Sequence, residues 1–265
     1  ACPATPATGL SFDGVDDQIQ LGAINVTGAI TIEAWVKPTS KHNFLTILNT
    51  KVAGFGNPGF LFAINEYNTN SGKLVFETSN AAVISNTPVT WGVWQHVAFT
   101  YDGATAKMYI NGVDVGSTNV NTGVNLLAST NPAYISHIPL FVAPTDKYDG
   151  VLDEVRVWNS ARTAQEIAGS KDCGLTGSET GLVAYYNFDN GITGGNNAGL
   201  TTLSDQTSNG NDGTLQNFAL TGATSNWVEG ANISGTCGPV ACAATATFQL
   251  YGVKPHWVNA GANDD

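Results

Sequence analysis

The sequence predicts an all-β protein, built as a two-sheet antiparallel sandwich or jelly roll with one short helix. Three observations lead to this fold class: short runs of alternating apolar and polar residues, frequent Asp-Gly and Asn-Gly turn pairs, and more Gly, Thr, Asn and Val than strong helix formers. Hydrophobic residues make up 42% of the 265 residues, so the chain can bury one large core.

The alternating runs begin near the N-terminus. The segment 11–21 carries an Asp-Gly turn signal and then alternates apolar residues with glutamines. The segment 29–37 reads AITIEAWVK and alternates throughout, so we expect a strand with one buried face. Two further strands are expected at 59–65 and 73–78.

The clearest meander lies in the middle of the chain. Its strand segments are 95–101, 106–111 and 113–117. Asp102-Gly103 and Asn111-Gly112 stand at its corners, and both dipeptides favour tight hairpin turns. The meander is typical of an antiparallel sheet.

A last alternating strand is expected at 151–158, which reads VLDEVRVW. The predicted helix follows it around 163–168, with Thr163 as its N-cap and Glu166 at the matching capping-box position.

The charge balance excludes several classes of partner. The chain carries 21 acidic and 10 basic side chains, for a formal net charge of −11. Because no basic stripe is available to neutralise phosphates, we expect no nucleic acid as partner and no attraction to an anionic membrane surface. No apolar run approaches the ~20 residues that cross a bilayer, so membrane insertion is not expected either.

Four segments carry a resemblance to a known family. They read SFDGVDDQIQL, ITIEAWVKP, WQHVAFTYDGATAKMYINGVDVGS and YDGVLDEVRVWNSARTAQEI, in this order between residues 9 and 168. Together they resemble the bacterial type of laminin G-like domain, which has the concanavalin A-like lectin and glucanase fold. The resemblance implies a two-sheet antiparallel jelly roll with a curved, concave face.

Residues 181–230 add a second block of family-like motifs, GLVAYYNFDNG, DQTSNGNDGTL and NWVEG. In the usual family order these lead-in strands precede SFDGVDD. The block therefore either begins an incomplete second copy or shows a circularly permuted domain. We favour permutation, because only about 35 residues follow position 230. The segment 181–188 should then pair with the strand at 151–158.

The resulting domain boundaries are a lead-in at 1–8, a jelly roll at 9–237 with its main motifs at 9–168 and its permuted strands at 181–230, and a tail or extra strand at 238–265.

No catalytic centre is indicated. Glucanases of this fold carry an E-x-D-x-x-E strand, whereas the acidic strand here reads Leu152-Asp153-Glu154-Val155 without a third carboxylate at the right step. Neighbouring residues point to opposite faces of a strand, so Asp153 and Glu154 cannot flank one sugar bond. The motifs G-x-S-x-G and H-E-x-x-H are also missing.

Calcium is the expected cofactor, because hard cations prefer carboxylate, amide and carbonyl oxygens. The resemblance to the glucanases implies Asp153 as the first ligand and Asp13 as the second. Further candidate ligands occupy one turn-rich segment: Asp205, Asn209, Asn211 and Asp212. The alternative is that these Asp-Gly and Asn-Gly pairs only form turns.

Aromatic residues are the candidate sugar contacts, because Tyr and Trp faces stack on the apolar faces of sugar rings. The candidates carried by loops are Tyr67, Trp91, Tyr134 and Tyr148. Core packing is the alternative for each of them, and we expect Trp94 and Trp158 in the core.

The four cysteines favour disulfides in an oxidising compartment, since no C-x-x-C is present to suggest zinc. Three pairings are possible. We expect Cys173–Cys237, which brackets the 181–230 block, together with Cys2–Cys242; a local Cys237–Cys242 loop is an open alternative. The first residues, without Met or an apolar leader, are typical of a mature secreted chain.

The expected function is that of a secreted, bacterial-type, non-catalytic module for carbohydrate binding or cell-surface adhesion, with a polysaccharide or surface glycan as partner and structural calcium. The alternative is a structural surface protein that assembles through the strand-like run at 244–252. A carbohydrate-active enzyme with unrecognised carboxylates is a third hypothesis.

Overall fold

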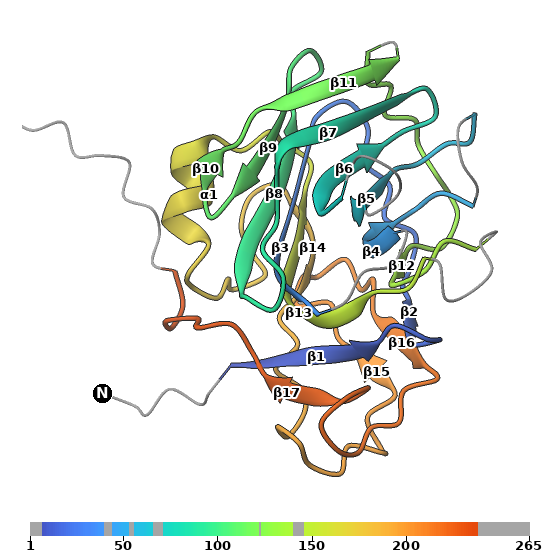
Figure 1. Cartoon of the computed structure of the whole chain (residues 1–265), viewed down its shortest axis with the longest axis vertical. Coiled ribbons are helices and arrows are strands. Elements are labelled where there is room, and N and C mark those ends of the chain that lie inside the picture. Colours follow the sequence, from blue (N-terminus) through green and yellow to red (C-terminus); the bar gives the residue numbers. More distant parts are fainter. Residues whose placement is uncertain are drawn as a thin grey trace, which may run out of the picture.

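The computed structural model describes residues 7–39, 44–52, 56–65, 71–121, 123–139 and 146–237. In this part of the chain two antiparallel sheets pack into a sandwich, which confirms the predicted fold class (Figure 1). Tyr67, Cys2, Cys242 and the tail at 238–265 lie outside the described residues.

The first sheet, called sheet A, has eight described strands in the order β10-β9-β8-β3-β13-β1-β17, with β14 also paired to β13. Its strands are β1 (Thr8–Asp13), β3 (Ile30–Pro38), β8 (Gln95–Tyr101), β9 (Ala106–Ile110), β10 (Val113–Asp114), β13 (Asp149–Trp158), β14 (Leu182–Tyr186) and β17 (Trp227–Glu229).

The second sheet, called sheet B, has nine described strands in the order β11-β7-β6-β5-β4-β12-β2-β16-β15. Its strands are β2 (Gln18–Gln20), β4 (Phe44–Asn49), β5 (Leu61–Asn65), β6 (Lys73–Glu77), β7 (Ala81–Pro88), β11 (Ser117–Asn121), β12 (Tyr134–Ile135), β15 (Thr202–Leu203) and β16 (Gly213–Gln216).

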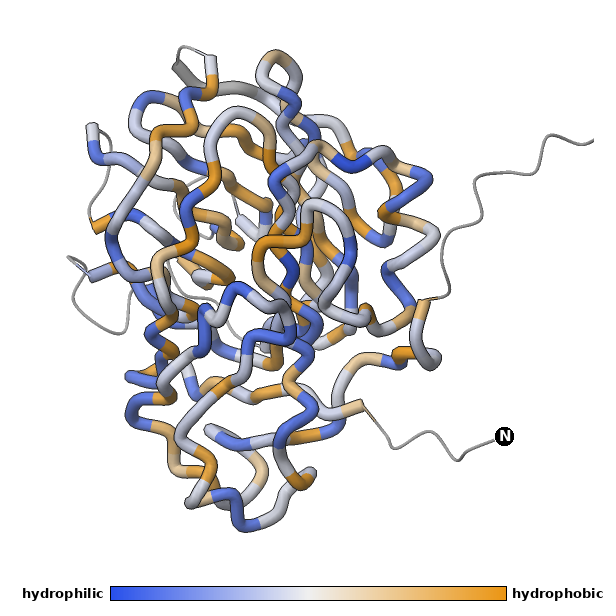
Figure 2. The backbone as a smooth tube through the Cα atoms, turned by 180° about the vertical axis from the view of Figure 1, so that it is seen from behind, coloured by the Kyte–Doolittle hydropathy of each residue, from blue (hydrophilic) through white to orange (hydrophobic). Residues whose placement is uncertain are grey.

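The core lies between the two sheets and follows the alternation of the sequence. In β3 the predicted inward face, Ile30, Ile32, Ala34 and Val36, is fully buried. Hydrophobic and hydrophilic residues are interspersed along the whole backbone (Figure 2). The outer face of β3 differs from a simple half-buried strand, since Glu33 is also 0% exposed.

The block at 181–230 joins the same two sheets. β14 pairs with β13 from Val155↔Tyr186 to Trp158↔Leu182, which confirms the expected neighbour of this segment. β16 lies beside β2 in sheet B, and β17 lies beside β1 in sheet A. Circular permutation stays our interpretation of this arrangement.

The helix α1 (Ala164–Ser170) begins at the predicted capping box. The Thr163 hydroxyl accepts the Glu166 N–H at 3.2 Å, and Glu166 accepts the Thr163 N–H at 2.7 Å. α1 has seven residues and lies beside β10 (Figure 1). No helix in the described part of the chain is long and apolar enough to cross a membrane.

A disulfide closes the segment that follows α1. Cys173 and Cys237 are bonded, with Cα atoms 5.1 Å apart, so this predicted pair is confirmed. The segment passes over the second half of β13 and covers the outer face of sheet A there: Arg156 donates to the carbonyls of Ser170 at 2.9 Å and Cys173 at 2.7 Å.

This cover encloses a network of buried charges. Glu33 accepts hydrogen bonds from the Trp158 indole and the Arg162 guanidinium, both at 2.7 Å, and lies 3.3 Å from the imidazole of His96. Burial by itself raises the pKa of Glu33, but His96, Arg156 and Arg162 together lower it to about 2. The ionised carboxylate is therefore stable inside the fold.

We predict that Glu33→Gln destabilises the protein by about 3 kcal/mol near neutral pH, because it removes one partner of a buried ionic network. Since the pKa of Glu33 is about 2 in the folded protein and about 4.3 when unfolded, its contribution is present above about pH 4 and is lost as the pH falls towards 2. Urea unfolding curves recorded between about pH 2 and about pH 4 should show that the free energy of unfolding depends less on pH in the variant than in the wild type.

The control for this measurement is Asp114→Asn, which breaks an exposed ion pair with Lys107 at 3.6 Å. Surface pairs contribute about 0–1 kcal/mol, so this variant should melt like the wild type. An acid dependence that is identical in Glu33→Gln and the wild type would contradict the assignment.

Candidate functional site

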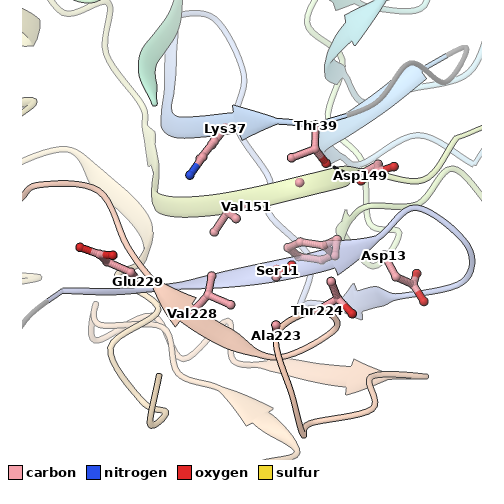
Figure 3. A pocket seen from close by; sticks show the side chains of 12 residues that line it. Ser11, Asp13, Lys37, Thr39, Asp149, Val151, Ala223, Thr224, Val228 and Glu229 are labelled. Carbon is pink, nitrogen blue, oxygen red and sulfur yellow. Dashed lines mark hydrogen bonds between the residues drawn. The ribbon is translucent and has the colours of Figure 1, made fainter. Parts of the chain in front are cut away.

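An open groove crosses the outer face of sheet A, over the ends of β1, β3, β13 and β17 (Figure 3). Its volume is about 490 Å³. Val151 and Val228 form its apolar floor, and its polar lining consists of Ser11, Asp13, Lys37, Thr39, Asp149, Thr224 and Glu229. Lys37 and Glu229 stand at one end, whereas Asp13, Asp149 and Thr39 stand at the other (Figure 3).

Strand alternation places these side chains outside the core. Phe12 and Leu152 are buried in the sandwich, so their neighbours Ser11 and Val151 face outwards. Gly150 allows the close approach of β13 to β3, because its φ is +135° and a Cβ there would lie 2.3 Å from the Lys37 carbonyl oxygen.

The groove suits a polar ligand with an apolar side. Its hydroxyls and carboxylates accept and donate hydrogen bonds, and its valines contact C–H groups. Among the described lining residues three carboxylates face one ammonium group, a balance that disfavours an anionic ligand. The described residues that line it include no histidine and no cysteine.

Asp13, Asp16 and Asp17 gather at the turn between β1 and β2. Each offers a carboxylate oxygen, and these oxygens lie within 4.8 Å of one another. Two of the three also hold the turn: Asp13 accepts the Val15 N–H at 2.8 Å, and Asp17 accepts the Asp13 N–H at 2.9 Å. Burial raises the pKa of Asp17 to about 7, against the hydrogen bonds from Ser225 and Asp13.

Asp153 is the most deeply buried of the predicted metal ligands, with 0% exposure. Its Oδ2 accepts the Ala231 N–H at 2.9 Å, while its Oδ1 has no hydrogen-bond partner among the described residues. Burial raises the pKa of Asp153 well above its usual range, and the charges of Glu154 and Asp189 act in the same direction.

The structure separates Asp153 from Asp13. Asp13 pairs with Asp149 in the β1–β13 ladder, and Asp153 lies four residues further along β13, about 13 Å at the usual rise of a strand. Besides its neighbour Glu154, the carboxylate whose charge acts on Asp153 is that of Asp189, which accepts the Thr8 N–H at 2.9 Å. Burial also raises the pKa of Asp189.

Asp189 was not among the residues expected from the sequence. The available signal was the NFDNG motif, which comes directly after the segment expected to pair with VLDEVRVW. Since β14 runs antiparallel to β13 and ends opposite Val155, the residues after it reach the position of Asp153.

The segment at 205–212 is held by its own hydrogen bonds. Asp205 accepts the N–H groups of Tyr185 at 3.1 Å and Asn211 at 3.0 Å, and Asp212 accepts the Asp205 N–H at 2.8 Å. The amides of Asn209 and Asn211 both donate to the Val183 carbonyl. These contacts are those of a turn-forming segment, and a metal role for its four candidate residues stays a prediction.

Only part of the aromatic set can meet a ligand. Tyr148 is 0% exposed and packs its ring against Phe12 at 5.9 Å, so the prediction of a rim contact was wrong for this residue. The segment before β13 turns inward instead of lying on the surface. Trp91 is half-buried and packs against the core. Tyr134 is half-buried in β12, and its ring meets that of His137 at 5.2 Å.

The chain belongs to the concanavalin A-like lectin/glucanases superfamily. The laminin G-type model of this family matches residues 13–168, more than half of the chain. No curated protein matches the chain.

Solved structures share the fold at low identity. A proposed carbohydrate-binding protein from Bacteroides ovatus aligns with a TM-score of 0.63 and 22% identity, over 81% of this chain and 59% of that one. A heptameric SAP-like pentraxin from Limulus polyphemus has a TM-score of 0.49 and 18% identity, over 62% of this chain and 81% of that one. This chain thus spans about three fifths of the Bacteroides protein.

A domain of an extracellular arabinanase from Geobacillus stearothermophilus, solved with arabinotriose, aligns with a TM-score of 0.47 and 19% identity, over 60% of this chain and 73% of that domain. At these identities the likenesses show the fold alone.

Proposed function

We propose that the domain is a secreted, non-catalytic module that binds polysaccharide or a cell-surface glycan. The observation that carries this proposal is the open groove on sheet A, where hydroxyl, carboxylate and ammonium groups surround a valine floor. Sugars offer hydroxyl groups around an apolar ring face, which matches this lining. The shared fold with a proposed carbohydrate-binding protein supports the same role, and the disulfide supports an oxidising compartment.

The acidic strand β13 supports binding without catalysis. Asp153 and Glu154 are 0% and 2% exposed, so no substrate reaches them. Glu154 is paired with Arg156 and accepts the Tyr185 hydroxyl at 2.8 Å. Asp153 and Glu154 therefore serve the fold, whereas the third carboxylate of β13, Asp149, lines the groove.

We predict that Val151→Arg, which fills the groove with a long charged side chain, weakens glycan binding there at least tenfold. A glycan array should first identify the ligands of the wild type, and titration calorimetry should then compare the variant. The matched control is Val113→Arg on β10, a residue that is 64% exposed and far from the groove in the order of sheet A.

Equal glycan affinities of Val151→Arg and Val113→Arg would show that the groove is not a glycan site. A wild-type protein that binds none of the plant, algal and bacterial glycans on the array would contradict the binding function itself.

We further propose that Asp153 and Asp189 hold a structural calcium ion. The fit rests on the buried Oδ1 of Asp153, which lacks a partner among the described residues, and on the carboxylate of Asp189, whose charge acts on Asp153. When bound, calcium supplies the positive charge that the buried carboxylate of Asp153 needs, with the exposed Asp189 as its second carboxylate. Thr8 and Ala231 position the two carboxylates through their backbone N–H groups.

We predict that a chelator lowers the melting temperature of the wild type by about 5–10 °C, since calcium at 100 times its Kd adds about 2.7 kcal/mol. Asp153→Asn should melt at the same temperature with and without chelator. Asp13→Asn should keep the chelator effect, because Asp13 lies at the other end of β1. Metal analysis of the isolated protein accompanies the melts.

A wild-type melt unchanged by chelator, together with no bound metal, would show that Asp153 is buried as a protonated acid. That outcome leaves the glycan-binding proposal untouched.

A further inference from the structure

We propose that sheet B carries a second glycan site, a polar surface that binds the apolar face of a neutral pyranose ring. We call it the amide–tyrosine face, and it consists of Gln18, Gln20, Tyr134, His137 and Gln216. This inference rests on the proposed glycan-binding function and adds a site on the opposite sheet, with its own class of ligand.

The register of sheet B places these side chains together on its outer face. Ile19, Ile135 and Leu215 are buried in the core, so the residues beside them in β2, β12 and β16 point away from it. Across the strands, Gln20 stands opposite Tyr134, and Gln18 stands opposite Gln216. Residues directly opposite in a ladder share one face.

A directional chain of hydrogen bonds orients the three amides. It starts at Lys147, which is 2% exposed and whose Nζ donates to Gln18 Oε1 at 2.6 Å. Gln18 Nε2 then donates to Gln216 Oε1 at 2.6 Å, and Gln216 Nε2 donates to Gln20 Oε1 at 3.2 Å. Because each amide oxygen is already engaged, each amide is held in one orientation.

The chain ends at a donor beside the aromatic ring. Gln20 Nε2 has no acceptor among the described residues, and Gln20 is half-buried opposite Tyr134. An oriented amide N–H group next to a ring is the arrangement that binds a sugar hydroxyl while the ring contacts the C–H face. Binding costs little conformational entropy, because the amide and the ring are already held in place before the sugar binds.

The ring of Tyr134 is also fixed. The imidazole of His137 meets it edge to face, with centroids 5.2 Å apart and planes at 85°. His137 Nδ1 in turn lies 3.0 Å from the Asp146 carboxylate, which is 0% exposed. The aromatic surface is therefore supported from inside the protein.

The charges around the face select neutral sugars. Lys147 and Asp146 offset each other and are both buried, and the remaining polar groups of the face are amides, a phenol and the imidazole of His137, which lies 3.0 Å from the Asp146 carboxylate. A uronate or sulfate would be desolvated here without a counter-charge, which is costly. The ligand class is thus an uncharged hexose or pentose pyranoside.

The test uses the groove-filled variant Val151→Arg as its background, so that residual binding reports on the amide–tyrosine face alone. Calorimetry with neutral oligosaccharides from glucan, mannan, galactan and xylan should show residual binding in this background. Adding Tyr134→Ala should weaken it at least tenfold, and adding Gln20→Ala should weaken it about 2- to 10-fold, the loss of one hydrogen bond.

Two variants control for folding and chemistry. Tyr134→Phe keeps the ring and should bind within about threefold, as expected for stacking. Gln206→Ala removes an exposed amide in another segment and should leave binding unchanged. Thermal melts show whether each variant is folded.

The outcomes separate the two proposals. Residual neutral-sugar binding that survives Tyr134→Ala and Gln20→Ala overturns the second site. Wild-type binding that disappears completely in Val151→Arg also overturns it, while the glycan-binding function stands. If the wild type binds no glycan at all, the proposed function fails first.

Discussion

The shared use of β13 is the constraint on which the rest of the structure depends. β3 occupies one side of this strand along its length, while β1 and β14 occupy the other side end to end. Where the two neighbours meet, the ladder shifts register and Glu154 takes a φ of +53°. Two carboxylates are buried at this junction, and only Glu154 has a buried cation, Arg156, as its partner. Asp153 needs a stabilising partner because the meeting of β1 and β14 along β13 buries its carboxylate.

The same strand divides the outer face of sheet A into two halves. Over its second half, α1 and the segment closed by Cys173–Cys237 cover Arg156 and Glu33, and the buried charges there are paired. Over its first half the face stays open and forms the groove. The position of the helix therefore decides which part of the outer face of sheet A stays open.

Sheet B is completed by strands from distant parts of the chain. Its amide–tyrosine face needs β2, β12 and β16, which lie in the first, middle and last thirds of the sequence. Because the 181–230 block supplies β16, it contributes Gln216 to this face as well as Asp189 to the junction at β13. The two sites that we propose, one on each sheet, would hold two glycan segments at once, which raises avidity without new contacts.

The sequence by itself determined the local features: the alternation of β3, the capping box at Thr163, the turn pairs and the family motifs. These depend on neighbours a few residues away, so periodicity and spacing are enough to predict them. Only the tertiary structure decided that Tyr148 is buried, that the charge of Asp189 acts on Asp153, and that three hydrogen-bonded glutamines end at Gln20 opposite Tyr134. The physical reason is that burial and charge proximity arise from long-range strand pairing, and the alternation of a strand does not specify its partner or register.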